Sequence, residues 1–190
     1  YGCSNKNVRS RLMGIPTLIA TNTESGDAAS AFTSGIDGTY DEYMFVCTDI
    51  NPATDSVNWT FQASTDGGSS YGVTVQNTTF RTYHTEDDGA ATLSYVTGRD
   101  LYQSTDYSQM IYEIGSGADE STSTILHLFN PSNTTFVKHF YSRSAGMHGT
   151  PASVDWFLAG YFNTTSAINA INFKFSSGNF DGVIQMYGIA

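Results

Sequence analysis

The sequence predicts an all-β protein, an antiparallel β-sandwich of jelly-roll-like form with roughly ten strands. The first observation is alternation between apolar and polar side chains, as in Val57–Ser64, which has the period of two of a half-buried strand. The second is that charged residues make up only 14% of the chain. Uncharged polar side chains must therefore cover the surface. The third is the abundance of aromatic residues, 12 Tyr and 12 Phe, which strands favour.

The chain divides into a short leader and one domain. Residues 1–14 indicate an extended N-terminal leader or anchoring segment, and residues 15–190 a single β-sandwich domain long enough to bury a sizeable core. Ile15–Ala20 is the first expected strand. Residues 21–38 are rich in Thr, Ser, Gly and Asp and predict a long surface loop, interrupted by one short strand at Ala31–Thr33.

The rest of the chain predicts strands in series. Tyr40–Thr48 is nearly all apolar, which indicates a strand covered on both faces, and residues 49–55 form a turn. After Val57–Ser64, the sequence Asp66-Gly67-Gly68 predicts a hairpin that lets Tyr71–Gln76 pair back. Residues 98–109 leave room for one helical turn. The remaining expected strands are Phe80–His84, Ala91–Thr97, Met110–Ile114, Thr124–Phe129, Thr135–Tyr141, Val154–Phe162, Ala167–Phe175 and Val183–Tyr187.

Charge and hydropathy exclude two classes of partner. The net charge of −10 argues against binding nucleic acid through phosphates. The chain has no run of 18 apolar residues, so we expect no membrane insertion. One basic cluster, formed by Lys6, Arg9 and Arg11, lies in the leader. It is either a solvated segment or a docking tail for an acidic partner, and we assign anchorage to it.

Two cysteines are too few for a zinc site or a disulfide framework. Cys47 lies in an apolar strand and is expected to be a small buried hydrophobic residue. A disulfide between Cys3 and Cys47 is the alternative.

No residue pattern in the sequence indicates a catalysed reaction, a bound cofactor or a bound metal ion. The loop carboxylates at Asp66, 86–88 and 119–120 lack the spacing of a calcium loop and are expected to be solvated. The four histidines are scattered, and we expect those inside strands to bond to neighbours. Glu42 and Glu113 fall within expected strands, where an acid and base pair for glycoside hydrolysis could lie, but neither stands in a signature. We therefore expect no catalytic residues.

Aromatic side chains are the other candidates for ligand contact. Trp59 shares its strand face with Val57 and Phe61, so we expect it in the core. Three tyrosines lie in expected loops or at their margins, where they could contact a host-surface glycan: Tyr71, Tyr102 and Tyr107.

Several segments resemble a family of virion proteins from tailed bacteriophages of aquatic bacteria. The segments that carry the resemblance are Ile15–Ile19, Phe32–Phe45, Ile50–Asp55, Phe129–Ser132, Val137-Lys138, Ala167–Phe180 and Met186–Ile189. The resemblance implies a structural protein on the virion surface, a capsid decoration or tail-fibre-type subunit with a jelly-roll-like module. Its implied partners are other virion proteins, including copies of itself, with a trimer favoured. A host-receptor or carbohydrate-binding module that uses loop Tyr and Asp residues is the alternative.

Overall fold

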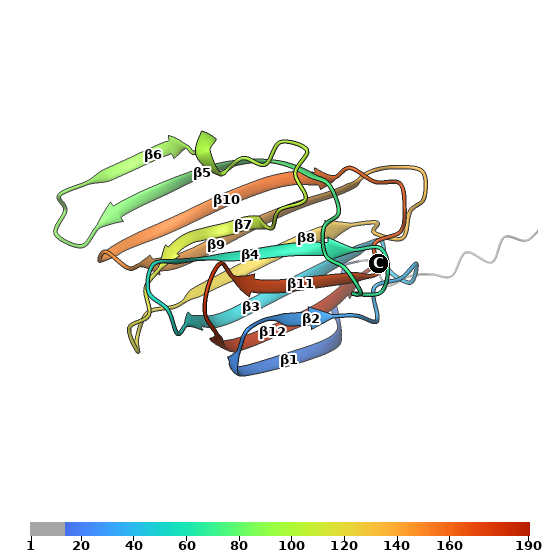
Figure 1. Ribbon diagram of the computed structural model, residues 1–190, viewed down its shortest axis with the longest axis horizontal. Helices are drawn as coiled ribbons and strands as arrows, with labels where there is room; N and C mark the ends of the chain where they lie inside the picture. Colours follow the sequence, from blue (N-terminus) through green and yellow to red (C-terminus); the bar gives the residue numbers. More distant parts are fainter. Residues whose placement is uncertain (1–13) are drawn as a thin grey trace, which may run out of the picture.

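The computed structural model describes residues 14–190, which form antiparallel β-strands (Figure 1). Twelve strands and one short 3₁₀ helix lie in the described range, so the all-β prediction is confirmed. The elements are β1 (Thr17–Asp27), β2 (Ser30–Phe32), β3 (Glu42–Pro52), β4 (Val57–Ser64), β5 (Val75–Thr85), β6 (Ala91–Tyr95), η1 (Thr97–Arg99), β7 (Ser108–Ile114), β8 (Thr122–Phe129), β9 (Lys138–His148), β10 (Ala152–Phe162), β11 (Ala170–Phe175) and β12 (Phe180–Ile189).

The twelve strands form one antiparallel sheet that curls into a nearly barrel-like shape, and we call its two facing parts the long layer and the short layer (Figure 1). The long layer has the order β1-β12-β3-β8-β9-β10-β5-β6, and the short layer has the order β7-β4-β11-β2. Pairing of Ile114 with His148 joins β7 to β9. Elsewhere, the Asn22 side chain of β1 donates hydrogen bonds to Ser30 Oγ (2.9 Å) and to the Ala31 carbonyl (3.2 Å) of β2. The two layers are therefore linked at both sides of the short layer.

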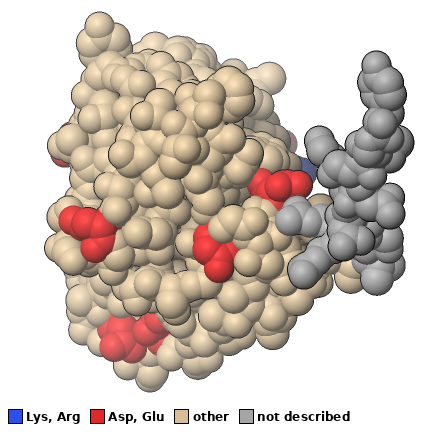
Figure 2. Space-filling model, turned by 90° about the vertical axis from the view of Figure 1, so that its right-hand side faces the viewer, with Lys and Arg blue, Asp and Glu red and all other residues tan. Residues whose placement is uncertain are grey.

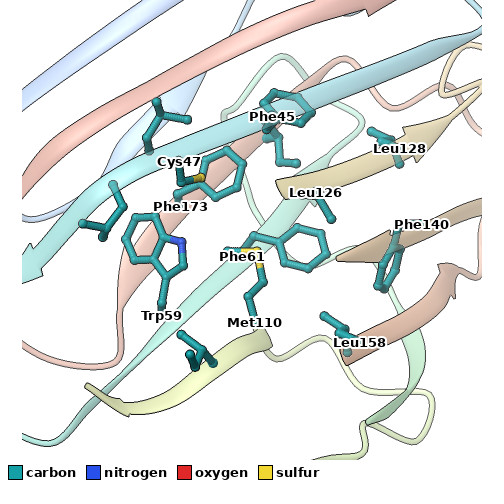
Figure 3. Close-up of a cluster of buried hydrophobic side chains, with 14 of the residues drawn as sticks. Phe45, Cys47, Trp59, Phe61, Met110, Leu126, Leu128, Phe140, Leu158 and Phe173 are labelled. Carbon is teal, nitrogen blue, oxygen red and sulfur yellow. The ribbon is translucent and has the colours of Figure 1, made fainter. Parts of the chain in front are cut away.

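Aromatic rings fill the space between the layers (Figure 3). Phe173 of β11 is fully buried, and its ring centroid lies 5.5 Å from that of Phe45 in β3. On its own layer it lies 6.0 Å from Trp59 and 6.4 Å from Phe61, both in β4. Trp59 is fully buried, as predicted. Burial of these rings is the main source of stability for the two layers.

Strand β4 has the predicted bounds, but both of its faces are covered. The outward-facing Gln62 is fully buried. Its side-chain nitrogen donates hydrogen bonds to the carbonyls of Thr105 (3.0 Å) and Asp106 (2.8 Å). The segment between η1 and β7 therefore covers part of the short layer. Alternation predicted the strand but carried no information about this cover.

The predicted hairpin after β4 is wrong. Strand β4 pairs with β7 and β11, whereas β5 pairs with β10 and β6. The turn closes on itself, because the Asp66 carboxylate accepts hydrogen bonds from the hydroxyls of Ser64 and Ser70, each at 2.6 Å. These bonds lower the pKa of Asp66 to about 2. Gly67 and Gly68 take the left-handed φ values of 73° and 89° that such a turn requires.

Three strands extend well beyond their predicted ends. Strand β1 continues to Asp27 through residues expected to form a loop, because it is an edge strand whose two faces are mostly exposed and carry polar side chains. Strand β3 continues to Pro52 past an irregularity near Asp49, whose φ is 52°. Only one face of β3 is buried, so its expected double cover is wrong. Strand β9 continues past Tyr141 to His148.

Candidate functional site

Exposed hydrophobic side chains gather on the outer face of the long layer, the face turned away from the short layer. Nine large hydrophobic side chains are exposed in the described range, and cross-strand register places six of them on this face. These six are Leu18, Phe80, Leu93, Tyr95, Ile125 and Tyr141. Five of the six lie on β5, β6, β8 and β9, and contiguous exposed apolar surface is typical of surfaces that contact another molecule.

A hollow opens in the middle of this outer face. Register places Thr78, Ala159, Tyr141 and His127 side by side on β5, β10, β9 and β8. The rings of Tyr141 and His127 stack, with centroids 4.6 Å apart and planes at 20°. On the other side of Tyr141, Ala159 carries only a methyl group, and a hollow of about 420 Å³ lies there. The outward-facing side chains that line it are those of Gln76, Thr78, Phe129, His139, Tyr141 and Tyr161.

A second hollow continues from the first. It has a volume of about 510 Å³ and shares Phe129 and His139 with its neighbour. Its far side is formed by the β8–β9 loop, with Asn133 and the exposed Phe136. Together the two hollows extend from β5 and β10 across β9 to the end of β8. Volumes of this size are those of small-ligand sites.

Charged side chains close to the hollow are hydrogen-bonded to neighbours on the same face. Arg143 donates two hydrogen bonds to Asp155, from Nε at 3.0 Å and from Nη2 at 2.7 Å, and this carboxylate raises the pKa of Arg143. The His127 ring is hydrogen-bonded to Glu42. No Asp, Glu, Lys or Arg lines the first hollow. The end view of the molecule shows acidic side chains in separate places among uncharged ones (Figure 2).

None of the three predicted ligand tyrosines lines this hollow, although the segment that carries Tyr102 pairs with β5 beside it. Tyr71 and Tyr107 are half-buried, and burial raises the pKa of each. The Tyr107 hydroxyl donates to Asn172 Oδ1 at 3.1 Å, and its ring lies 4.3 Å from Lys174 Nζ. Both contacts are to β11, so Tyr107 helps to cover the short layer. Tyr102 is 84% exposed. Glycan contact by these three residues stays a prediction.

The glutamates that could have formed a catalytic pair lie far apart. Glu42 is paired with Phe129, close to the first residues of β9, and its carboxylate bonds to His127. Glu113 bonds to His148 Nε2, at 3.0 Å, where β9 ends. The length of β9 separates them by about 30 Å at roughly 3.3 Å per residue. Paired carboxylates in glycosidases lie within about 10 Å of each other.

Some predicted features fall outside the described range. The proposed anchorage residues Lys6, Arg9 and Arg11 lie there, as does Cys3. Cys47 is a free thiol and fully buried, and burial raises its pKa to about 12. Between residues 14 and 190, no group of three or more His, Cys, Asp or Glu is arranged to hold a metal ion. In the same range, no helix has the length and apolar character needed to cross a membrane.

The residues around the hollow were missed at the sequence level. Their strands were predicted from the apolar residues that face inward, such as Leu158 and Phe162 in β10. In the second half of this strand the outward-facing residues are Phe157, Ala159 and Tyr161, so neither face carries polar side chains there. That doubled pattern was the available signal, since an outward phase normally carries polar residues.

No protein-family model matches this chain, and no curated protein sequence matches it.

Proposed function

We propose that the protein is a non-enzymatic structural subunit of a virion surface, a capsid decoration or tail-fibre-type protein. In this proposal the two layers form a β-sandwich of jelly-roll type that associates with copies of itself and with other virion proteins. The sequence resemblance supports the virion assignment. The exposed hydrophobic side chains on one outer face support association in place of catalysis.

The single observation that carries the assembly role is the edge formed by β5 and β6. Strand β6 pairs only with β5, so its other side offers unpaired backbone groups. Leu93 is 73% exposed on β6, and Tyr95 and Phe80 lie beside it on the outer face. The Phe80 ring stacks on Phe157 with centroids 4.5 Å apart. An apolar edge of this kind is stabilised when a second copy covers it.

Sedimentation of the full chain tests this role. We expect an oligomer, with a trimer favoured, and we expect Leu93→Lys to shift it toward the monomer because a buried unpaired charge is costly. Phe136→Lys is the matched control, since Phe136 is 67% exposed but lies in the loop between β8 and β9. A wild-type monomer at high concentration, or an unaffected Leu93→Lys oligomer, would contradict the proposal.

The virion assignment has its own test. Mass spectrometry of purified particles should detect the chain at a fixed ratio to the other particle proteins. Deleting residues 1–13, which contain Lys6, Arg9 and Arg11, should release it from the particle. Retention of the truncated chain would show that anchorage lies elsewhere.

A second candidate function is the binding of a host-surface glycan. The outer-face hollow beside Ala159 favours it, because its walls combine aromatic rings with uncharged polar groups. Loop residues such as Tyr102 are the alternative location for the same function.

A further inference from the structure

Tyr141 has one covered ring face and one open ring face. Its ring contacts in the described range are with His127 and Phe129, and both of these residues belong to β8. On the opposite side, the register partner of Tyr141 is Ala159 of β10. The Ala159 methyl group is too small to cover a phenol ring. The open face of Tyr141 therefore forms a wall of the 420 Å³ hollow.

The other residues that line the hollow supply hydrogen-bonding groups. Tyr161 and His139 are register partners, and their ring centroids lie 6.0 Å apart. The Tyr141 and Tyr161 hydroxyls and the His139 ring nitrogens make no hydrogen bond to another residue between 14 and 190. The Gln76 side chain accepts one weak hydrogen bond, at 3.3 Å, and keeps its amide donors. The hollow thus has several donors and acceptors around an aromatic wall.

Charge defines the class of ligand. The hollow has no charged lining residue, and beside it Arg143 is paired with Asp155 and the Glu42 carboxylate is hydrogen-bonded to His127. An anionic ligand would find no cation to bind, in a protein whose net charge is −10. A neutral ligand with one apolar face and several hydroxyl groups matches these walls.

A second copy of the chain fits the hollow less well. A stable protein interface needs roughly 800 Å² of buried area on each partner. The Arg143–Asp155 pair lies one register row from Tyr141 along β9, and Glu42 borders Phe129 on the other side. These charged side chains interrupt the apolar surface on two sides, so the area around the hollow is ligand-sized.

We propose that the hollow binds a neutral pyranose unit of a glycan, packed against the open face of Tyr141. The C–H groups on one face of a pyranose carry slight positive charge and pack on the negative face of an aromatic ring. Its hydroxyl groups would bond to Tyr161, His139 and Gln76. The proposal rests on the second candidate function and is independent of the assembly role.

Saturation-transfer NMR of the full chain tests the proposal. The probes are neutral hexasaccharides of glucose, galactose, mannose and N-acetylglucosamine, with oligogalacturonate as the charged counterpart of the galactose series. We expect binding of at least one neutral probe and none of oligogalacturonate. Tyr141→Ala, which removes the wall, and Ala159→Phe, which fills the hollow, should each weaken binding at least about tenfold. Leu18→Ala, at the β1 end of the long layer, is the control and should leave binding unchanged, and Tyr102→Ala tests the loop alternative.

Each other outcome overturns a stated part of the account. If no neutral probe binds, the assignment of the hollow as a binding site and the proposed glycan-binding function are both wrong. The assembly role is unaffected. If Tyr102→Ala abolishes binding while Tyr141→Ala does not, the protein binds glycans at its loops, and the hollow is not the binding site. If Ala159→Phe instead changes the sedimentation mass, the occupant is a second copy. Urea midpoints of the variants, measured by tryptophan fluorescence, exclude loss of folding, since Tyr141 and Ala159 face outward.

Discussion

Replacing Phe173 by Ala should destabilise the protein more than almost any other single change. The ring is fully buried and lies within 6.4 Å, centroid to centroid, of Phe32, Phe45, Trp59 and Phe61. A buried phenylalanine covers roughly 150 Å² or more, and at about 25 cal/mol per Å² its loss costs about 4 kcal/mol. The four aromatic contacts place the expected loss at the upper end of the range of about 3–5 kcal/mol for such changes.

Urea denaturation followed by tryptophan fluorescence measures this loss, because Trp59 and Trp156 are both fully buried. Phe80→Ala is the matched control. Phe80 also stacks on another ring, but it is 44% exposed, so we expect a loss of about 1 kcal/mol. If Phe173→Ala costs no more than Phe80→Ala, the two layers do not pack through these rings.

Three further predictions concern single sites. In a Cys3→Ser variant, Cys47 should not react with a thiol reagent at neutral pH until the protein is denatured, since burial raises its pKa to about 12; reaction in the native state would contradict its placement. Asp66 has a pKa of about 2, below its usual 3.8, so its ionised form stabilises the turn, and this stability should disappear as the pH falls from 3.8 toward 2. Asp66→Asn should therefore lower the urea midpoint at pH 6 but not at pH 2, and an equal effect at both would be contrary evidence. Gly160→Ala should lower the midpoint strongly, because a new Cβ would lie 2.8 Å from Phe140 Cζ and closer still to the Gln76 carbonyl, whereas an unchanged midpoint would show that β5 and β10 approach less closely.

Alternation predicted the strands in which apolar side chains face inward and polar side chains face outward. The strand at 57–64 was predicted with its observed bounds, because Trp59 and Phe61 define its inward phase. The same rule failed at β1, where exposure of both faces allows polar residues at every position, as in Thr21–Ser25. It also failed to end β9 correctly, since Ser142 and Ser144 are buried polar residues on its inward phase.

Pairing between distant strands was beyond the reach of sequence patterns. The Asp-Gly turn after β4 suggested a local hairpin, but Asp66 closes that turn with neighbouring serines. The strands that flank β4 come from residues 108–114 and 170–175, far along the chain. The residues of a turn determine only the local backbone. They predicted the turn after β4 but not the strands with which β4 pairs.

The candidate site was missed for a related reason. The rings of Tyr141 and His127 meet because the two residues are register partners on neighbouring strands. The sequence of one strand does not show which residue will lie beside it on the next. The small size of Ala159 becomes informative only when its neighbour on β9 is known. The loop tyrosines were visible in the sequence because loop position is a local property, whereas an exposed sheet face is not.

The central claim of the site assignment is that the hollow on the outer face of the long layer binds a neutral glycan. A ¹H–¹⁵N NMR titration of the full chain with the neutral hexasaccharide that gives the strongest saturation transfer tests it most directly. The account predicts that the shifted amides cluster around Tyr141, Ala159 and Tyr161 on β9 and β10. Shifts confined to the loops around Tyr71 and Tyr102, or no shifts at all, would contradict it.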